Sequence, residues 1–239
     1  KTCRSSTVMT VDDLQVFSLF RRRRLSTTEA DGNPLIYALK GLKGYAIDDA
    51  GKEAMWGAAD KIFRAWTCPW KPSHVVSIPS RHSVSFDLAS WVASFLEVDH
   101  VSAPMVCKKT VTEVLEEAEA LKDSGAVPKR DLKAFKKQLG RLSLAPPGKT
   151  FQMKEIDVSV RQYLHPWRIS EKSKDFIGHD LLLVDDLIGT GASLSTCANC
   201  LVENGHSVVG GMSLFSPLDR ELAKKASVAR RKRRGGRKA

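Results

Sequence analysis

The sequence predicts an α/β domain built on a parallel central sheet that is covered by helices. Short apolar runs alternate with amphipathic segments of about 10 to 15 residues, which is the pattern of successive βαβ units. Hydrophobic residues make up 42% and charged residues 27% of the chain, so a collagen-like, mostly disordered or disulfide-scaffold protein is excluded. A length of 239 residues is sufficient for one such domain with a substantial core.

In the first third of the chain, local sequence signals predict the helices and strands. Residues 1–32 have a mixed composition and are expected to form an N-terminal extension, with a short strand or turn at residues 16–20. Asn33 followed by Pro34 is a helix start, since Asn caps the first turn and Pro suits its first position. A longer amphipathic helix is predicted over residues 48–66, because its apolar residues recur at helical spacing.

Strand, loop and helix then repeat along the chain. The predicted strand and helix pairs are 74–78 with 87–97, 101–106 with 110–122, and 181–184 with 192–203, before a last strand at 207–215. A parallel sheet of this kind binds its ligands at the carboxyl ends of the strands, beside the point where the strand order reverses.

Residues 108–174 depart from this rhythm and are predicted to be an inserted helical lid or hood. They hold two helical patterns, 110–122 and 129–139, followed by Pro and Gly breakers and irregular sequence. A long excursion between core strands is usually functional. Trp167 within it is expected either to stack on a base or to pack inside the lid. The core domain is thus 33–216, and residues 217–239 form a basic tail expected to be disordered.

The net charge of +11 is confined to two segments. Residues 224–239 carry nine Lys or Arg and no acid, and residues 128–141 carry six against one acid. Such segments bind phosphate backbones, so a DNA, RNA or nucleoprotein partner is expected, with a merely solvated surface as the alternative. The candidate contacts are Lys133, Lys136 and Lys137 in the helix and Arg231, Lys232, Arg233 and Arg234 in the tail.

The five cysteines are few, odd in number and irregularly spaced, which argues against a secreted disulfide framework and favours the cytoplasm. No run approaches the roughly 18 apolar residues of a membrane span, so no membrane association is expected. Cys197 and Cys200 form an isolated pair at helical spacing and are expected to be buried hydrophobic residues rather than metal ligands.

The most informative segment is residues 181–193, which read Leu-Leu-Leu-Val-Asp-Asp-Leu-Ile-Gly-Thr-Gly-Ala-Ser. An apolar strand ends in two carboxylates, and a loop of small residues leads into a helix. The loop offers backbone N–H groups, hydroxyl donors and a helix N-terminus, which together suit a phosphate monoester. Asp185 and Asp186 would repel that phosphate, so we expect them to accept hydrogen bonds from sugar hydroxyls or to anchor a hydrated metal.

This segment resembles the ribose-5-phosphate loop of type I phosphoribosyltransferases. The sequence departs from the family pattern at Gly189, where the family has Thr, and at Ser193, which keeps a hydroxyl. The resemblance implies the phosphoribosyltransferase fold, with Asp185 and Asp186 as catalytic residues on the ribose hydroxyls. It assigns the 5′-phosphate to the loop residues Gly189, Thr190, Gly191, Ala192 and Ser193.

The resemblance also implies a pyrophosphate site, which we expect at two places. One is the loop Ser80-Arg81-His82 after the first core strand, and the other is the pair Lys108 and Lys109. For both, a solvated surface loop or lysine pair is an equally plausible reading.

Within the family the ComF-like branch is most similar, on the early helix at residues 33–44, although the paired cysteine motif common in that branch is missing. The resemblance implies 5-phosphoribosyl pyrophosphate or a nucleotide as substrate, an N-glycosidic bond made or broken, and Mg2+ with little direct protein ligation. Homo-oligomers are common among similar folds. The alternative is a non-catalytic or toxin-like effector subunit of a retron-type bacterial defence system, which binds nucleotide and associates with nucleic acid.

Overall fold

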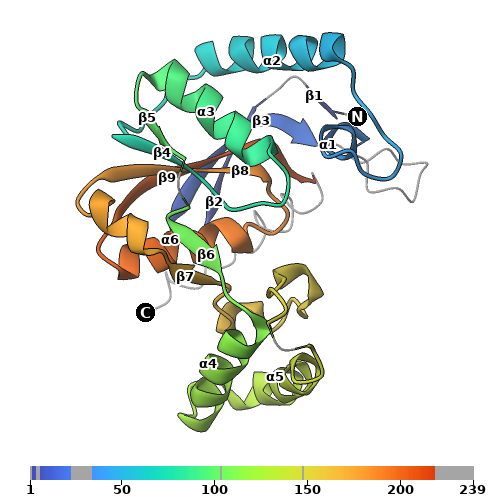
Figure 1. The fold of residues 1–239 in the computed structure, drawn as a ribbon, viewed down its shortest axis with the longest axis vertical. Helices are drawn as coiled ribbons and strands as arrows, with labels where there is room; N and C mark the ends of the chain where they lie inside the picture. Colours follow the sequence, from blue (N-terminus) through green and yellow to red (C-terminus); the bar gives the residue numbers. More distant parts are fainter. Residues whose placement is uncertain (1, 4–5, 23–33, 103, 147, 219–239) are drawn as a thin grey trace, which may run out of the picture.

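The computed structural model describes residues 2–3, 6–22, 34–102, 104–146 and 148–218 (Figure 1). Within these residues the centre of the molecule is a seven-stranded sheet with the order β1-β3-β9-β8-β4-β5, and β2 pairs with β3 beside it. The strands are β1 (Thr2–Cys3), β2 (Thr7–Val11), β3 (Leu14–Arg22), β4 (His74–Ser77), β5 (Asp99–Val101), β8 (Asp180–Leu187) and β9 (Ser207–Leu218).

The predicted parallel sheet is confirmed. Strands β3, β9, β8, β4 and β5 are parallel to their neighbours, whereas β1 and β2 pair antiparallel with β3. The chain steps from β4 outward to β5 on one side and from β8 outward to β9 on the other, so the strand order reverses between β4 and β8. Ser77 lies opposite Val184 at this point, which brings the loops that follow both strands to the same edge.

Helices cover both faces of the sheet, as Figure 1 shows. On one face lie α1 (Pro34–Leu39), α2 (Asp49–Arg64) and α3 (Val84–Leu96), and on the other lies α6 (Ala192–Glu203). Leu182 and Val184 of β8 pack in the core on the side of α2 and α3, and Leu181 and Leu183 pack in the core beside α6. Because both faces are buried, this strand is apolar at successive positions instead of alternating.

Side-chain caps fix two of the helix starts. The Asp48 carboxylate accepts a hydrogen bond from the backbone N–H of Gly51 at 2.8 Å, ahead of α2. Thr110 and Glu113 form a reciprocal capping box ahead of α4 (Val111–Asp123). Each cap satisfies N–H groups that have no acceptor within their own helix.

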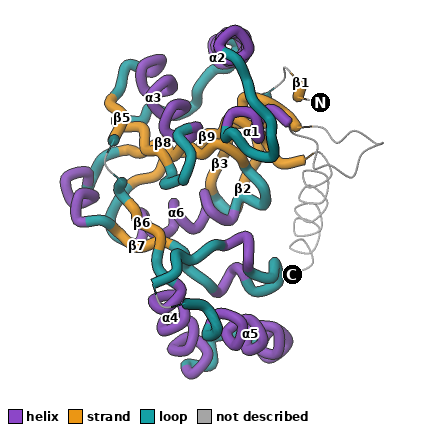
Figure 2. Tube along the Cα trace, turned by 45° about the vertical axis from the view of Figure 1, so that its right-hand side comes forward, coloured by secondary structure: helices purple, strands orange, loops and turns teal. Residues whose placement is uncertain are grey.

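Residues 108–174, hereafter the helical excursion, include a small unit with its own core at residues 111–164, whereas Trp167 packs in the core of the central domain. Strand β6 (Val106–Lys108) pairs antiparallel with β7 (Trp167–Ile169), and between them lie α4, α5 (Lys129–Leu142) and the short 3-10 helices η1 (Met153–Glu155) and η2 (Arg161–Tyr163); η3 (Glu171–Phe176) follows β7. A separate hydrophobic cluster fills this unit, with Phe135 and Phe151 at its centre. Figures 1 and 2 show α4 and α5 extending away from the sheet.

The structure differs from the sequence prediction at two strands. Residues 16–20, expected as a short strand or turn, belong to the nine-residue strand β3 within the sheet. The single strand expected at 101–106 is wrong: the chain forms β5 and β6, which belong to different sheets. Pro104 lies between them and cannot donate to a strand ladder. The predicted cap Asn33 and the tail residues Arg231, Lys232, Arg233 and Arg234 lie outside the described residues. Among the described helices, none is both long and apolar enough to cross a membrane.

Candidate functional site

The loop between β8 and α6 forms one side of a pocket of about 170 Å³. Its walls include Asp185, the whole segment from Leu187 to Leu194, and Met153 and Arg161 from the helical excursion. The predicted phosphate-binding residues Gly189, Thr190, Gly191, Ala192 and Ser193 therefore all line one pocket, at the carboxyl end of β8. The first-turn N–H groups of α6 have no acceptor within the helix, so this end of α6 favours an anion.

Gly191 sets the shape of the loop. Its φ of +86° lies in the left-handed region, which side chains disfavour. A Cβ at this position would lie 2.5 Å from Cγ1 of Val11 in β2. The turn between β2 and β3 thus supports the loop from behind, and the Ser195 hydroxyl donates a hydrogen bond to Asp12 of that turn. Only glycine allows this close approach.

The two aspartates do different things because successive strand residues point to opposite sides. The carboxylate of Asp186 is buried, and its Oδ2 lies 2.6 Å from Nζ of Lys40, just beyond α1. Asp185 instead lines the pocket. Its Oδ1 accepts a hydrogen bond from the backbone N–H of Asp186 at 2.8 Å. One carboxylate is therefore neutralised within the protein, and the other faces the pocket.

Asp185 has a strongly perturbed acidity. Burial, followed by the charge of neighbouring Asp186, raises the pKa of Asp185 from 3.8 to about 7. The Asp186 N–H, Lys40 and Lys108 oppose this rise. A pocket carboxylate that titrates near neutrality is typical of a functional site.

The predicted pyrophosphate loop lies at the neighbouring strand end. It follows β4, whose continuation is anchored by a hydrogen bond from the Ile78 N–H to the Val184 carbonyl at 2.8 Å. Ser80 and Arg81 are exposed and His82 is half-buried, and the His82 N–H donates to the Ser80 hydroxyl at 3.3 Å. None of the three is part of the walls of the 170 Å³ pocket.

The structure separates Lys108 from Lys109. Lys108 lies close enough to Asp185 to lower its pKa, and its ammonium lies 5.7 Å from the centroid of the Trp167 ring. Lys109 is buried and pairs with Glu117 at 2.6 Å. It lines a different cavity of about 360 Å³. Of the two predicted lysines, only Lys108 is therefore associated with the electrostatics of Asp185.

Trp167 packs and is not placed to stack on a base. It is buried, and its Nε1–H lies 3.2 Å from the Ser193 carbonyl and 3.1 Å from Oγ1 of Thr196. It therefore joins β7 to the first turn of α6. Cys197 is buried and Cys200 half-buried, and burial raises the pKa of both thiols. Nowhere in the described chain do three His, Cys, Asp or Glu side chains gather as a metal-ligand set.

The three predicted basic contacts of α5 are all exposed but do not share one surface. Lys133 and Lys137 line a groove together, whereas Lys136 lines another cavity with Glu119 and Lys122.

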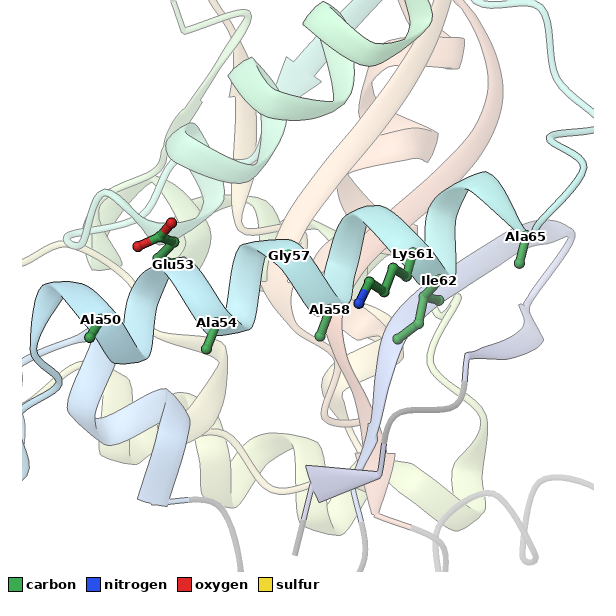
Figure 3. Close-up of a pocket in the computed structure, with 8 residues that line it drawn as sticks. All are labelled: Ala50, Glu53, Ala54, Gly57, Ala58, Lys61, Ile62 and Ala65. Carbon is green, nitrogen blue, oxygen red and sulfur yellow. The ribbon is translucent and has the colours of Figure 1, made fainter.

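A more voluminous cavity lies elsewhere and lacks the chemistry of the β8–α6 loop. It has a volume of about 730 Å³ and lies along α2. Figure 3 shows Ala50, Ala54 and Ala58 on the same side of this helix. The described lining is Ala50, Glu53, Ala54, Gly57, Ala58, Lys61, Ile62 and Ala65.

Sequence reasoning missed three residues of the site: Lys40, Met153 and Arg161. Lys40 is 146 positions from its partner Asp186, and no local pattern connects the two. Met153 and Arg161 come from an irregular stretch of the excursion. The available signal was the pair of lysines, Lys40 and Lys43, beside the glycines that follow the first helix.

Comparison of the chain with protein-family models and with curated protein sequences gives no match.

Proposed function

We propose that this protein binds a phosphorylated ribose, as in 5-phosphoribosyl pyrophosphate or a nucleotide, and makes or breaks an N-glycosidic bond at that sugar. The observation that carries the proposal is the meeting of Asp185, the loop Gly189 to Ser193 and Arg161 in one pocket. A volume of about 170 Å³ is smaller than the ~300 to 1,000 Å³ of drug-sized sites. It suits a phosphate and the adjoining edge of a sugar, with the rest of the ligand outside.

The phosphate would lie against the loop. The backbone N–H groups of the loop and the first turn of α6 point their positive ends at an anion. Arg161 adds a full positive charge from the opposite wall. Its Nε donates to the Ile156 carbonyl at 2.9 Å, which fixes the guanidinium beside the pocket. A cation together with oriented amides is the usual arrangement for phosphate binding.

Asp185 would act on the sugar. As an ionised carboxylate it accepts hydrogen bonds from two ribose hydroxyls, and its negative charge stabilises the positive charge that develops at the anomeric carbon when the leaving group departs. Asp186 would be a positioning residue, because its charge is already held by Lys40. Its backbone N–H orients the Asp185 carboxylate.

The leaving pyrophosphate would be held at the neighbouring strand end by Ser80, Arg81 and His82, with Lys108 on the same side as Asp185. Lys109 is omitted because its ammonium is committed to Glu117. The excursion, which supplies Met153 and Arg161 to the pocket, would exclude water and select the acceptor.

The pocket residues do not form a complete Mg2+ site by themselves. They fit an Mg2+ ion that arrives bound to the phosphates of the substrate. Asp185 is the one carboxylate among the described pocket residues, and Mg2+ commonly keeps its waters and binds one or two carboxylates together with substrate phosphates. When bound, the ion would neutralise pyrophosphate and polarise its bond to the sugar. Asp185 would meet it through water or the ribose hydroxyls.

Turnover of 5-phosphoribosyl pyrophosphate by Asp185→Asn tests the proposal. We expect pyrophosphate release in the presence of Mg2+ and a mixture of nucleobases to fall by about 100-fold or more, as for loss of a group that stabilises transition-state charge. Binding of ribose 5-phosphate, followed by calorimetry, should change much less. Asp180→Asn is the matched control, since Asp180 is exposed at the other end of the same strand.

Two outcomes would count against the proposal. If the wild-type protein binds neither ribose 5-phosphate nor 5-phosphoribosyl pyrophosphate, the pocket does not have the assigned ligand. If it binds them but neither releases pyrophosphate nor cleaves nucleotides, the protein is a non-catalytic binding subunit.

A further inference from the structure

The outer side of α5 forms a basic groove in the helical excursion. The groove has a volume of about 440 Å³ and is lined by four cations, Arg130, Lys133, Lys137 and Arg141, together with Gln138 and Asp157. The cations are three, four and four residues apart, which places them along one side of a helix. They span about 16 Å at 1.5 Å per residue.

This arrangement is more specific than a generally charged helix. Lys129 and Lys136 belong to the same helix and are seven residues apart, yet neither lines the groove. Lys136 lies at a different cavity, beside Glu119 and Lys122. The helix therefore has one uniformly basic side and a second side of mixed charge.

The acids near the groove do not cancel its charge. Asp157 is the one acidic residue in its described lining. Hydrogen bonds from Ser159 and the charges of Arg141 and Arg161 lower the pKa of Asp157, so its ionised carboxylate offsets one of the four cations and the groove stays positive. Arg130 approaches Asp131 at 3.5 Å. Within the described chain, Lys133 and Lys137 form no ion pair with an acid.

The apolar side of α5 is unavailable for a membrane. Phe135, Leu139 and Leu142 are buried in the core of the excursion, whereas a helix that binds a lipid surface inserts its apolar side. A linear row of cations about 16 Å long instead complements the row of phosphates of a nucleic-acid strand, which carries one negative charge per nucleotide.

We propose that this groove binds the phosphate backbone of a nucleic acid, without sequence specificity, through Lys133, Lys137 and Arg141. The inference goes beyond the proposed function and does not depend on it. Asp157 lines the groove and Arg161 lines the 170 Å³ pocket. The short segment from Asp157 to Arg161 therefore contributes one residue to each.

The test uses the full-length chain and fluorescein-labelled 20-nucleotide single-stranded RNA and DNA, with polarisation measured over a series of salt concentrations. The groove variant is Lys133→Gln with Lys137→Gln. The control is Lys129→Gln with Lys136→Gln, which removes the same charge from the same helix and leaves the C-terminal basic segment unchanged in both proteins.

We expect the groove variant to bind about tenfold more weakly and to reduce the slope of log affinity against log salt by about 1.4, the value for two lost phosphate contacts on a single strand. In the control variant, neither the affinity nor the salt slope should change by more than about a third of the change in the groove variant. Equal losses in both variants, no loss in either, or equally tight binding of polyglutamate would overturn the proposal. All four lysines are exposed, so both variants should fold.

Discussion

Asp185 connects the pH of the solution to both stability and ligand binding. Its pKa is raised from 3.8 to about 7, so between these values the folded state holds a proton that the unfolded state has lost. The free energy of unfolding therefore falls as pH rises from about 4 to 7 and levels off above it. At ~1.4 kcal/mol per pKa unit this amounts to at most ~4 kcal/mol, reduced by solvent on the pocket side.

Replacing Asp185 with Asn should remove that pH dependence. Replacing Lys40 with Met should raise the pKa of Asp185 above 7, because the charge of Lys40 lowers this pKa. Urea unfolding between pH 4 and 8 measures the first effect, and carboxyl-carbon NMR titration of Asp185 measures the second. The control is Lys52→Met, whose ammonium pairs with exposed Asp49. An unchanged midpoint in Lys40→Met would show that the two groups are not electrostatically connected.

Lys40→Met should also destabilise the fold, since it leaves the buried Asp186 carboxylate without its cation. Losses of about 3 to 5 kcal/mol are typical of such broken pairs. The two effects of Lys40→Met can be measured separately. Urea unfolding gives the loss of stability, and the NMR titration gives the pKa of Asp185.

At the scale of elements, the contact between the β2–β3 hairpin and the start of α6 positions the loop between β8 and α6. Gly191→Ala should destabilise the protein by about 2 to 4 kcal/mol, because it combines a left-handed backbone with a Cβ forced against Val11. Gly189→Ala should be nearly neutral, since nothing lies within 4 Å of its added Cβ.

Urea unfolding of the two variants measures the difference, and Val11→Ala combined with Gly191→Ala should recover part of the loss. If Gly189→Ala and Gly191→Ala are equally stable, the close packing described between β2 and α6 is not formed.

Sequence signals predicted the elements whose patterns are local. The helix at residues 192–203 has the predicted bounds, and the strand before it was recognised from its apolar run and acid pair. Strand β3 was underestimated because Val16, Phe17 and Leu19 are all buried and show no alternation, and its partner β9 is almost 200 residues away. The pairing of Lys40 with Asp186 and the arrival of Arg161 depend likewise on long-range folding.

At the scale of the whole molecule, the helical excursion is attached through a narrow neck. Lys108 lies opposite Trp167 in the β6–β7 pair, and the Lys109 N–H donates to the Pro166 carbonyl at 2.9 Å. The separate hydrophobic cluster of the excursion is formed by residues within 111–164, whereas Trp167 packs in the core of the central domain. Removal of residues 111–164 therefore takes away one cluster as a unit.

Replacing residues 111–164 with a short Gly-Ser linker should therefore leave the sheet folded, with its unfolding free energy changed by no more than ~2 kcal/mol. Binding of ribose 5-phosphate should weaken, since Arg161 is lost from the pocket. Amide hydrogen exchange checks the sheet, and calorimetry checks the ligand. Loss of protection across β8 and β9 would show that the sheet requires the excursion.

The neck also has an evolutionary consequence. Since the chain leaves and re-enters the central domain at paired residues, the whole segment between them can be lengthened, shortened or exchanged by a single genetic event without altering any strand of the sheet. Both Arg161 at the pocket and the cations of α5 belong to that segment. If the proposed roles of the pocket and the groove hold, a lineage changes its acceptor and its macromolecular partner together in this way, while the loop after β8 stays constant.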